Sequence, residues 1–171
     1  REPIKGDGGD AGGGTVRKLQ MESQRVNGIV RPGTVDLETR TVEIVFTTGQ
    51  SGKRWHWDIG YYMEELEVSK AAIRTERLDK GLSIIDNHDR WAGTSGVHGI
   101  TESYRIENGE LIGTARFATD DDSDVVFKKV VDGVLRHVSL GYNVLKFDVK
   151  AGKGENELDT YRAVDWEPLE L

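Results

Sequence analysis

An Asn-Gly pair at positions 108 and 109, set between two strand-like segments, constrains the fold of this chain more than any other sequence feature. Residues 99–106 and 110–117 on either side are rich in β-branched and aromatic residues, as β-strands are. Asn-Gly accepts the positive φ angles of the two-residue turn whose twist matches an antiparallel pair of strands. The pattern therefore predicts a β-hairpin that turns at residues 107–109.

Strand-like sequence also dominates the rest of the chain. Further strands are predicted at residues 41–47, 82–86, 138–149 and 160–164. A Pro-Gly pair indicates a turn over residues 31–34, and two glycines indicate a loop over residues 48–53. We expect a β-rich α+β domain over residues 16–171, with its sheet curled or closed into a barrel. Residues 1–15 are glycine-rich and are interpreted as a flexible linker or a cloning remnant, because they cannot bury enough apolar surface to offset their backbone entropy.

Two helices are predicted among the strands. Acidic residues 120–122 favour a helix over residues 124–131, because they complement the dipole at its start, and Gly133 favours its end. The buried side of this helix is expected to hold Phe127, Val130, Val131 and Val134. A second helix is predicted over residues 61–72. Its inner face is expected to hold Met63, Leu66, Val68 and Ala71.

Composition excludes several classes of protein. The length of 171 residues fits one domain with a sizeable core. No apolar run approaches the roughly 18 residues that a transmembrane helix needs, so a membrane span is not expected. The absence of cysteine excludes disulfides, thiolate zinc sites and a cysteine nucleophile. The net charge of -7 argues against a nucleic-acid partner, because phosphate binding requires clustered lysine and arginine.

Two side chains with catalytic chemistry follow apolar, strand-like runs. His88 comes after residues 82–85, and Ser139 comes shortly after Val134 and Leu135. A histidine that takes the proton of a serine hydroxyl supplies the minimum machinery of nucleophilic acyl transfer, because the hydroxyl is almost never ionised at neutral pH. Each residue alone also has an ordinary structural interpretation, His88 as a turn residue and Ser139 as a small polar residue within a strand.

A metal site is the alternative chemistry. Imidazoles and carboxylates that zinc accepts are supplied by His56, Asp58, His88, Asp89 and His98. Their spacings match no recognised zinc motif, and the acidic residues 120–122 lack the spaced ligands of a calcium loop. We therefore expect no metal and no cofactor. Trp55 and Trp57, which flank His56, are interpreted as core residues rather than as the rim of a peptide groove.

Two motifs resemble those of a known family. The segments Asp86-Asn87-His88-Asp89-Arg90 and Ser139-Leu140-Gly141-Tyr142, together with the closing residues 166–171, resemble the prohead (capsid maturation) serine proteases of tailed phages, the HK97-type family. The resemblance runs over about residues 16–171. It implies the herpesvirus-protease-like fold, a closed β-barrel surrounded by a few helices. It also implies Ser139 as the nucleophile and His88 as its general base.

The resemblance implies a third catalytic residue and supporting groups. Glu170 is the preferred residue to orient His88, with Asp89, Asp165 and His98 as alternatives. The Ser-Leu-Val that usually follows in the family is missing after Leu171, so the domain is interpreted as truncated at its C-terminus. Candidates for the oxyanion hole or its support are Arg136, Leu140 and Gly141.

The same resemblance implies a biological role. An endopeptidase of this family acts inside an immature capsid, in the host cytoplasm, on the scaffold or the major capsid protein and often on itself. A homodimer is a further partner that the related herpesvirus proteases suggest. The rival interpretation is a non-catalytic structural or scaffolding β-barrel of a virion.

Overall fold

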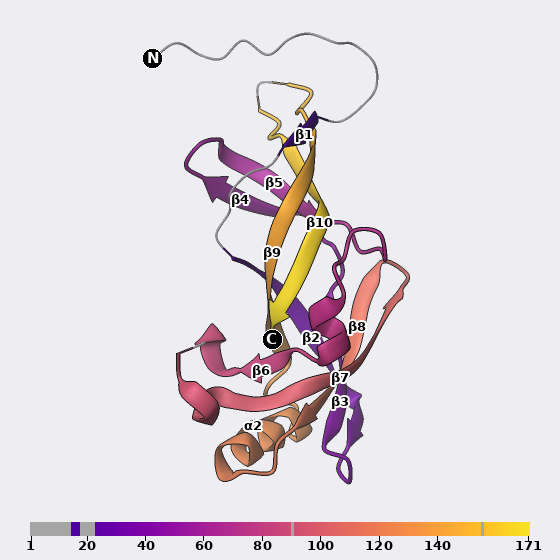
Figure 1. Cartoon of the computed structure of the whole chain (residues 1–171), viewed down its shortest axis with the longest axis vertical. Coiled ribbons are helices and arrows are strands. Elements are labelled where there is room, and N and C mark those ends of the chain that lie inside the picture. Colours follow the sequence, from indigo (N-terminus) through magenta and orange to yellow (C-terminus); the bar gives the residue numbers. More distant parts are fainter. Residues whose placement is uncertain (1–14, 18–22, 90, 155) are drawn as a thin grey trace.

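The computed structural model describes residues 15–17, 23–89, 91–154 and 156–171, which contain one ten-stranded sheet. Neighbouring strands follow the order β4-β5-β10-β9-β2-β3-β8-β7-β6, and β1 attaches to β9 (Figure 1). The strands are β1 (Thr15–Arg17), β2 (Gln24–Asp36), β3 (Thr41–Thr47), β4 (Gly52–His56), β5 (Gly60–Leu66), β6 (Ser83–Ile85), β7 (Val97–Glu107), β8 (Glu110–Phe117), β9 (His137–Lys150) and β10 (Thr160–Glu170). The described residues also form helices α1 (Glu76–Lys80) and α2 (Asp121–Val131), and the 3-10 turns η1 (Asp86–His88) and η2 (Gly93–Gly96). Residues 1–14 of the predicted linker lie outside the described residues, and Thr15 begins β1.

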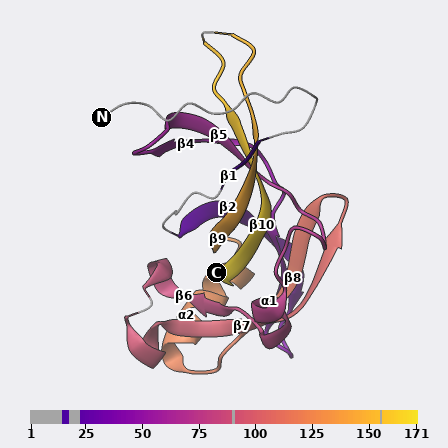
Figure 2. The ribbon, with the colours of Figure 1, turned by 45° about the horizontal axis from the view of Figure 1, so that its top comes forward.

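The sheet curls into an open half-barrel, so the prediction of a closed barrel is wrong (Figure 2). Closure needs a continuous ladder between the first and last strands. Here β5 pairs in parallel with β10 over residues 160–163 and occupies that edge of β10. The seam between β10 and β6 is bridged at Leu171, whose N–H donates to Ser83 O at 3.0 Å and whose carbonyl accepts from Ile85 N at 2.7 Å. The prediction of a β-rich fold with a few helices is confirmed.

The predicted hairpin is present. β7 and β8 pair antiparallel out to Glu107 and Glu110, and the two residues between them take positive φ, 52° at Asn108 and 77° at Gly109. The predicted strand over residues 41–47 is also confirmed, since β3 has these bounds and pairs with β2 and β8. These segments form the wall of the half-barrel that carries α2.

Two local predictions fail because tertiary pairing overrides local sequence. The predicted helix over residues 61–72 is wrong: β5 places Tyr62, Glu64 and Leu66 alternately in the interior and pairs with both β4 and β10. The predicted turn over residues 31–34 is also wrong, because these residues lie within β2. The ladder between β2 and β3 is irregular between Arg31 and Asp36, and such a place tolerates proline and glycine within a strand.

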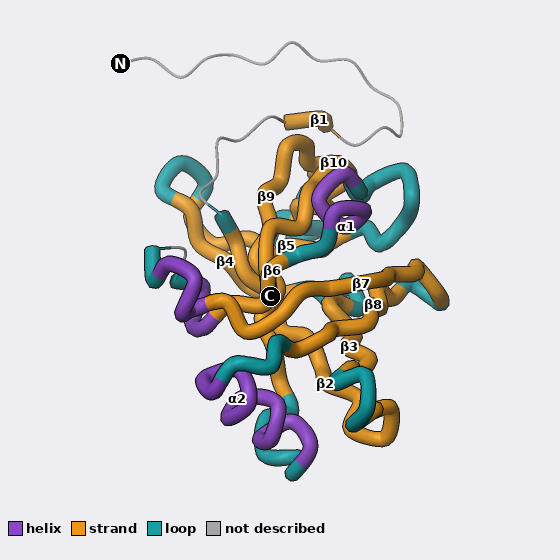
Figure 3. The backbone as a smooth tube through the Cα atoms, turned by 60° about the horizontal axis from the view of Figure 1, so that its bottom comes forward, coloured by secondary structure: helices purple, strands orange, loops and turns teal. Residues whose placement is uncertain are grey.

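Helix α2 ends at Val131 as predicted, but it begins at Asp121, three residues before the predicted start. The Asp120 carboxylate caps it by accepting a hydrogen bond from Ser123 N at 3.0 Å, and Gly133 follows its C-cap with a φ of 67°. The helix packs beside β2, β7 and β8 (Figure 3). Phe127 and Val130 are buried as expected, but Val134 is 74% exposed, so the predicted buried side is only half correct.

The aromatic core lies between the long strands β9 and β10 and their neighbours. Trp166, Tyr142 and Tyr161 are almost completely buried there. The prediction that Trp55 and Trp57 belong to the core is wrong, because they are 48% and 86% exposed. They belong to the β4–β5 hairpin, where β4 ends the strand order and has no outer neighbour in the described sheet to cover them.

Candidate active site

His88 is presented by an unusual piece of backbone at the end of β6. The strand ends at Ile85 and the chain turns through η1, where Asp89 N donates to Asp86 O at 2.9 Å. Asn87 and His88 both have positive φ, 48° and 57°, which is uncommon for residues other than glycine. Such backbone costs on the order of 1–3 kcal/mol per residue and persists where the surroundings impose it, as they commonly do at functional sites.

The His88 imidazole contacts Glu170 at the end of β10. Its Nδ1 lies 3.2 Å from Glu170 Oε1, and the two side chains are only 9% and 8% exposed. A carboxylate in this position fixes the orientation of an imidazole and stabilises its charged form. Because Nδ1 faces the carboxylate, Nε2 is the nitrogen left for a proton acceptor role on the other side of the ring.

Gly141 provides the space that the Glu170 carboxylate occupies. The two residues are directly paired across β9 and β10, next to a register shift between Pro168 and Glu170. A β-carbon at position 141 would overlap Glu170 Oε1 and lie 2.8 Å from Glu170 Cδ. Any side chain at this position would therefore displace the carboxylate or the strand.

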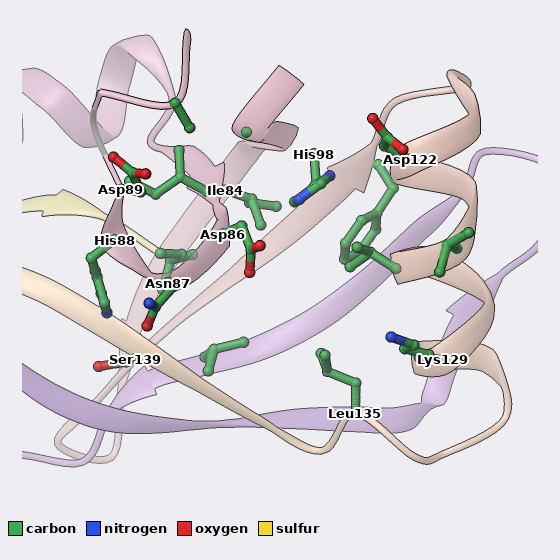
Figure 4. Close-up of a pocket in the computed structure, with 18 of the residues that line it drawn as sticks. Ile84, Asp86, Asn87, His88, Asp89, His98, Asp122, Lys129, Leu135 and Ser139 are labelled. Carbon is green, nitrogen blue, oxygen red and sulfur yellow. The ribbon is translucent and has the colours of Figure 1, made fainter. Parts of the chain in front are cut away.

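Ser139 lies two residues before Gly141 on β9, opposite Asn27 of β2. Its half-buried side chain lines the same cavity as His88. In Figure 4 the imidazole of His88 points toward the strand that carries Ser139. Across the described residues no hydrogen bond joins the Ser139 hydroxyl to the imidazole. Catalytic hydrogen bonds commonly tighten only when substrate is bound, so this geometry is compatible with proton transfer.

The cavity that contains both side chains has a volume of about 810 Å³. Figure 4 shows His88 and Ser139 at one side of it and α2, with Asp122 and Lys129, at the other. The far side also contains apolar side chains. The sequence did not predict this apolar part of the cavity, because several distant segments build it. One signal was present: Val125 does not fit the buried stripe of α2, and it lines the cavity.

The alternatives for the third catalytic residue lie elsewhere or have other contacts. Asp165 is bound by Arg74, with Nε and Nη2 at 2.7 and 2.8 Å from its two oxygens. Asp89 lines the cavity, and its Oδ1 accepts from Trp91 N at 2.8 Å. His98 also lines the cavity, and its Nδ1 is 3.5 Å from the Ser123 hydroxyl. The structure thus brings Glu170, rather than these residues, against His88.

The proposed support residues have different surroundings. The Arg136 side chain donates from Nε to Gly133 O at 2.6 Å, at the end of α2, and it does not line the cavity. Leu140 is fully buried in the core. Gly141 is the candidate that is directly paired with Glu170, the residue that contacts His88.

The described residues were compared with the requirements of a metal site and of a membrane-spanning helix, and they meet neither. Within the described ranges, no group of three or more histidine and acidic side chains is arranged to hold a metal ion. The helices of these ranges are also too short or too polar to cross a membrane.

Comparisons with known proteins point to phage capsids. No family model matches the chain. It is 29% identical over 119 residues to the major capsid protein of Halomonas phage phiHAP-1, and the match covers 70% of this chain but only 19% of that protein. The structure is similar to that of the bacteriophage T4 capsid assembly protease gp21, with a TM-score of 0.50 and 12% identity over 88% of this chain and 96% of the other. The chain therefore shares its overall fold with that T4 protein.

Proposed function

We propose that this chain is the protease domain of a phage capsid maturation system and acts as a serine endopeptidase. The observation that carries the proposal is the buried contact between His88 Nδ1 and Glu170 Oε1 at 3.2 Å, in a cavity that Ser139 shares with His88. A buried carboxylate, an imidazole and a hydroxyl in this order are the parts that acyl transfer requires. The likeness to a capsid assembly protease supports the same function.

The chemistry follows from these three side chains. Ser139 Oγ attacks the carbonyl carbon of the scissile peptide bond while His88 Nε2 takes the hydroxyl proton. Glu170 stabilises the imidazolium that forms. The tetrahedral intermediate then collapses, the C–N bond breaks, and His88 gives its proton to the leaving amine. Water then attacks the resulting ester while His88 takes its proton. The bond to Ser139 Oγ breaks, His88 gives the proton to Oγ, and the fragment leaves with a new carboxyl terminus.

The substrate that we propose is a scaffold or major capsid polypeptide, cleaved inside the procapsid. The similarity to a major capsid protein supports this assignment, since it relates the chain to one segment of a much longer capsid polypeptide. The motifs around His88 and Ser139 further support assignment to the HK97-type prohead proteases. Cleavage of the chain's own polypeptide and formation of a homodimer belong to the same proposal.

A structural role in the capsid is the second candidate. It is favoured by the same relative, because that protein is a capsid subunit. A purely structural domain has no need for a histidine in the left-handed backbone conformation against a buried carboxylate. The two functions therefore differ in whether Ser139 is a reactive nucleophile.

The test is labelling with a fluorophosphonate probe, read by intact mass and by mapping of the modified residue. We expect one adduct on Ser139 in the parent chain and none in Ser139→Ala or His88→Ala. Ser95→Ala is the matched control, because Ser95 is exposed and lines the same cavity, and it should label normally. Absence of an adduct on the parent chain, or labelling that survives His88→Ala, would contradict the proposed protease function.

A further inference from the structure

The part of the cavity that extends from Ser139 toward α2 has an apolar wall. Ile84 and Val138 lie near its catalytic side, and α2 and the segment after it contribute Val125, Val126 and Leu135. Val125 is 55% exposed although it borders a cavity. Apolar side chains in a concave site, next to a few polar groups, are typical of places that bind a ligand's apolar surface.

Backbone hydrogen bonds and ring packing hold this wall in place. The N–H groups of Val134 and Leu135 both donate to Lys129 O, at 2.9 and 3.0 Å, and so fix the segment after α2 against the helix. The helix itself is held by Phe127, whose ring lies 5.4 Å from that of Phe117. A rigid wall pays little ordering entropy on binding, which favours selection of one class of side chain.

The charged groups around the cavity disfavour an acidic ligand. Among the described lining residues, the carboxylates are those of Asp86, Asp89 and Asp122, and Lys129 is the one ammonium group. A carboxylate brought into this space would meet net negative charge and lose its water, and both effects oppose binding.

We propose that this wall, formed by Ile84, Val125, Val126, Leu135 and Val138, binds an aliphatic or aromatic side chain of the substrate polypeptide next to the scissile bond. The inference rests on the proposed protease function and names the substrate feature that the site selects. The cavity is continuous from the apolar wall to Ser139, so a chain whose carbonyl lies at the hydroxyl would place a neighbouring side chain on the wall. Acidic side chains at that position are selected against.

The experiment uses the full chain and a peptide mixture derived from a digested proteome, with cleavage sites identified by mass spectrometry. We expect one position beside the scissile bond to favour aliphatic or aromatic residues over Asp and Glu by about tenfold or more. Leu135→Asp should reduce this preference to less than about threefold. Val125→Lys, at an exposed position that tolerates substitution, should shift it toward acidic residues. Val134→Asp is the matched control, since Val134 is 74% exposed and does not line the cavity.

Labelling of Ser139 by the fluorophosphonate probe separates the two ways of failing. If the parent chain labels and cleaves without an apolar preference, or if Val125→Lys labels normally and keeps the parent's preference, the apolar wall does not select substrate and this inference is wrong. If the parent chain neither labels nor cleaves, the proposed function itself is wrong and the inference is lost with it.

Discussion

Two buried carboxylates lie against neighbouring residues of β9, and their surroundings differ. Glu64 is 3% exposed and accepts hydrogen bonds from the hydroxyls of Tyr62, at 3.1 Å, and Tyr142, with Arg54 Nε at 3.6 Å. Glu170 is 6% exposed and contacts the imidazole of His88. One carboxylate therefore faces tyrosine hydroxyls and a guanidinium, and the other faces an imidazole, the side chain most often used as a general base.

The difference predicts a structural role for Glu64 and a catalytic role for Glu170. Burial and the nearby charge of Glu64 raise the pKa of Tyr62 and of Tyr142, so both hydroxyls keep their protons and act as fixed donors. Glu64 also borders a smaller cavity of about 300 Å³, whose described lining includes Ser51 but no histidine. A carboxylate and a serine without an imidazole have no proton acceptor suited to acyl transfer. We therefore expect mutations at Glu64 to change stability and mutations at Glu170 to change activity.

The largest expected effect is on activity at Glu170. Glu170→Gln keeps the size of the side chain but removes the charge that, in the proposed mechanism, orients and stabilises the His88 imidazolium. The rate constant for fluorophosphonate labelling of Ser139 should fall by about 10³-fold or more. The free energy of unfolding, measured with urea, should change by about 1 kcal/mol or less. A labelling rate within tenfold of the parent's would remove Glu170 from the catalytic set.

The next effect is on stability at Glu64. Glu64→Ala removes the carboxylate that accepts from the hydroxyls of Tyr62 and Tyr142 and pairs with Arg54, and should lower the free energy of unfolding by about 2–3 kcal/mol. Labelling of Ser139 below the unfolding transition should stay within threefold of the parent's rate. Glu65→Ala, on the opposite face of β5, is the control and should change stability by about 0.5 kcal/mol or less. Loss of labelling in folded Glu64→Ala would mean that the two carboxylates are not separate sites.

The smallest expected effect, on the rate of Ser139 labelling, tests how precisely the Glu170 carboxylate must be placed. Gly141→Ala introduces a β-carbon where the carboxylate lies, and should slow labelling of Ser139 by about tenfold, because the carboxylate is displaced rather than removed. In a Glu170→Ala background the space is free, so the same substitution should have no further effect on labelling. This double-mutant cycle compares the two losses directly. Equal slowing in both backgrounds would show that Gly141 acts through the β9 backbone and not through Glu170.

The sequence predicted correctly those turns, strands and helix ends that depend on interactions between residues close together in the chain. The Asn108-Gly109 turn, β3 and the end of α2 depend on neighbouring residues. The parallel pairing of β5 with β10 was missed because it joins residues about a hundred positions apart. The barrel is open because β6 meets the end of β10 only through the backbone hydrogen bonds of Leu171, a detail of register that local sequence does not reveal.

The candidate site was only partly accessible from sequence. The resemblance pointed to Glu170 as the partner of His88, and the structure places these two side chains in contact. The space at Gly141 depends on strand register between β9 and β10, which sequence spacing does not reveal. The apolar wall was missed because its residues come from separate elements, and the local trace of it was the poor fit of Val125 to the buried side of α2. The roles of Ser139, His88 and Glu170 stay predictions until the labelling experiment is done.

The two backbone hydrogen bonds of Leu171 join the edges of the open barrel, and they also fix the position of Glu170 beside His88. Leu171 holds the seam to β6 through two backbone hydrogen bonds, and the residue before it is Glu170. A brief local opening of this seam would withdraw the carboxylate from His88 while the rest of the sheet stayed folded. The fraction of time in which the proposed site can act would then equal the fraction of time that the two backbone hydrogen bonds of Leu171 are formed. The amide protons of Ile85 and Leu171 would report that fraction through their exchange with deuterium.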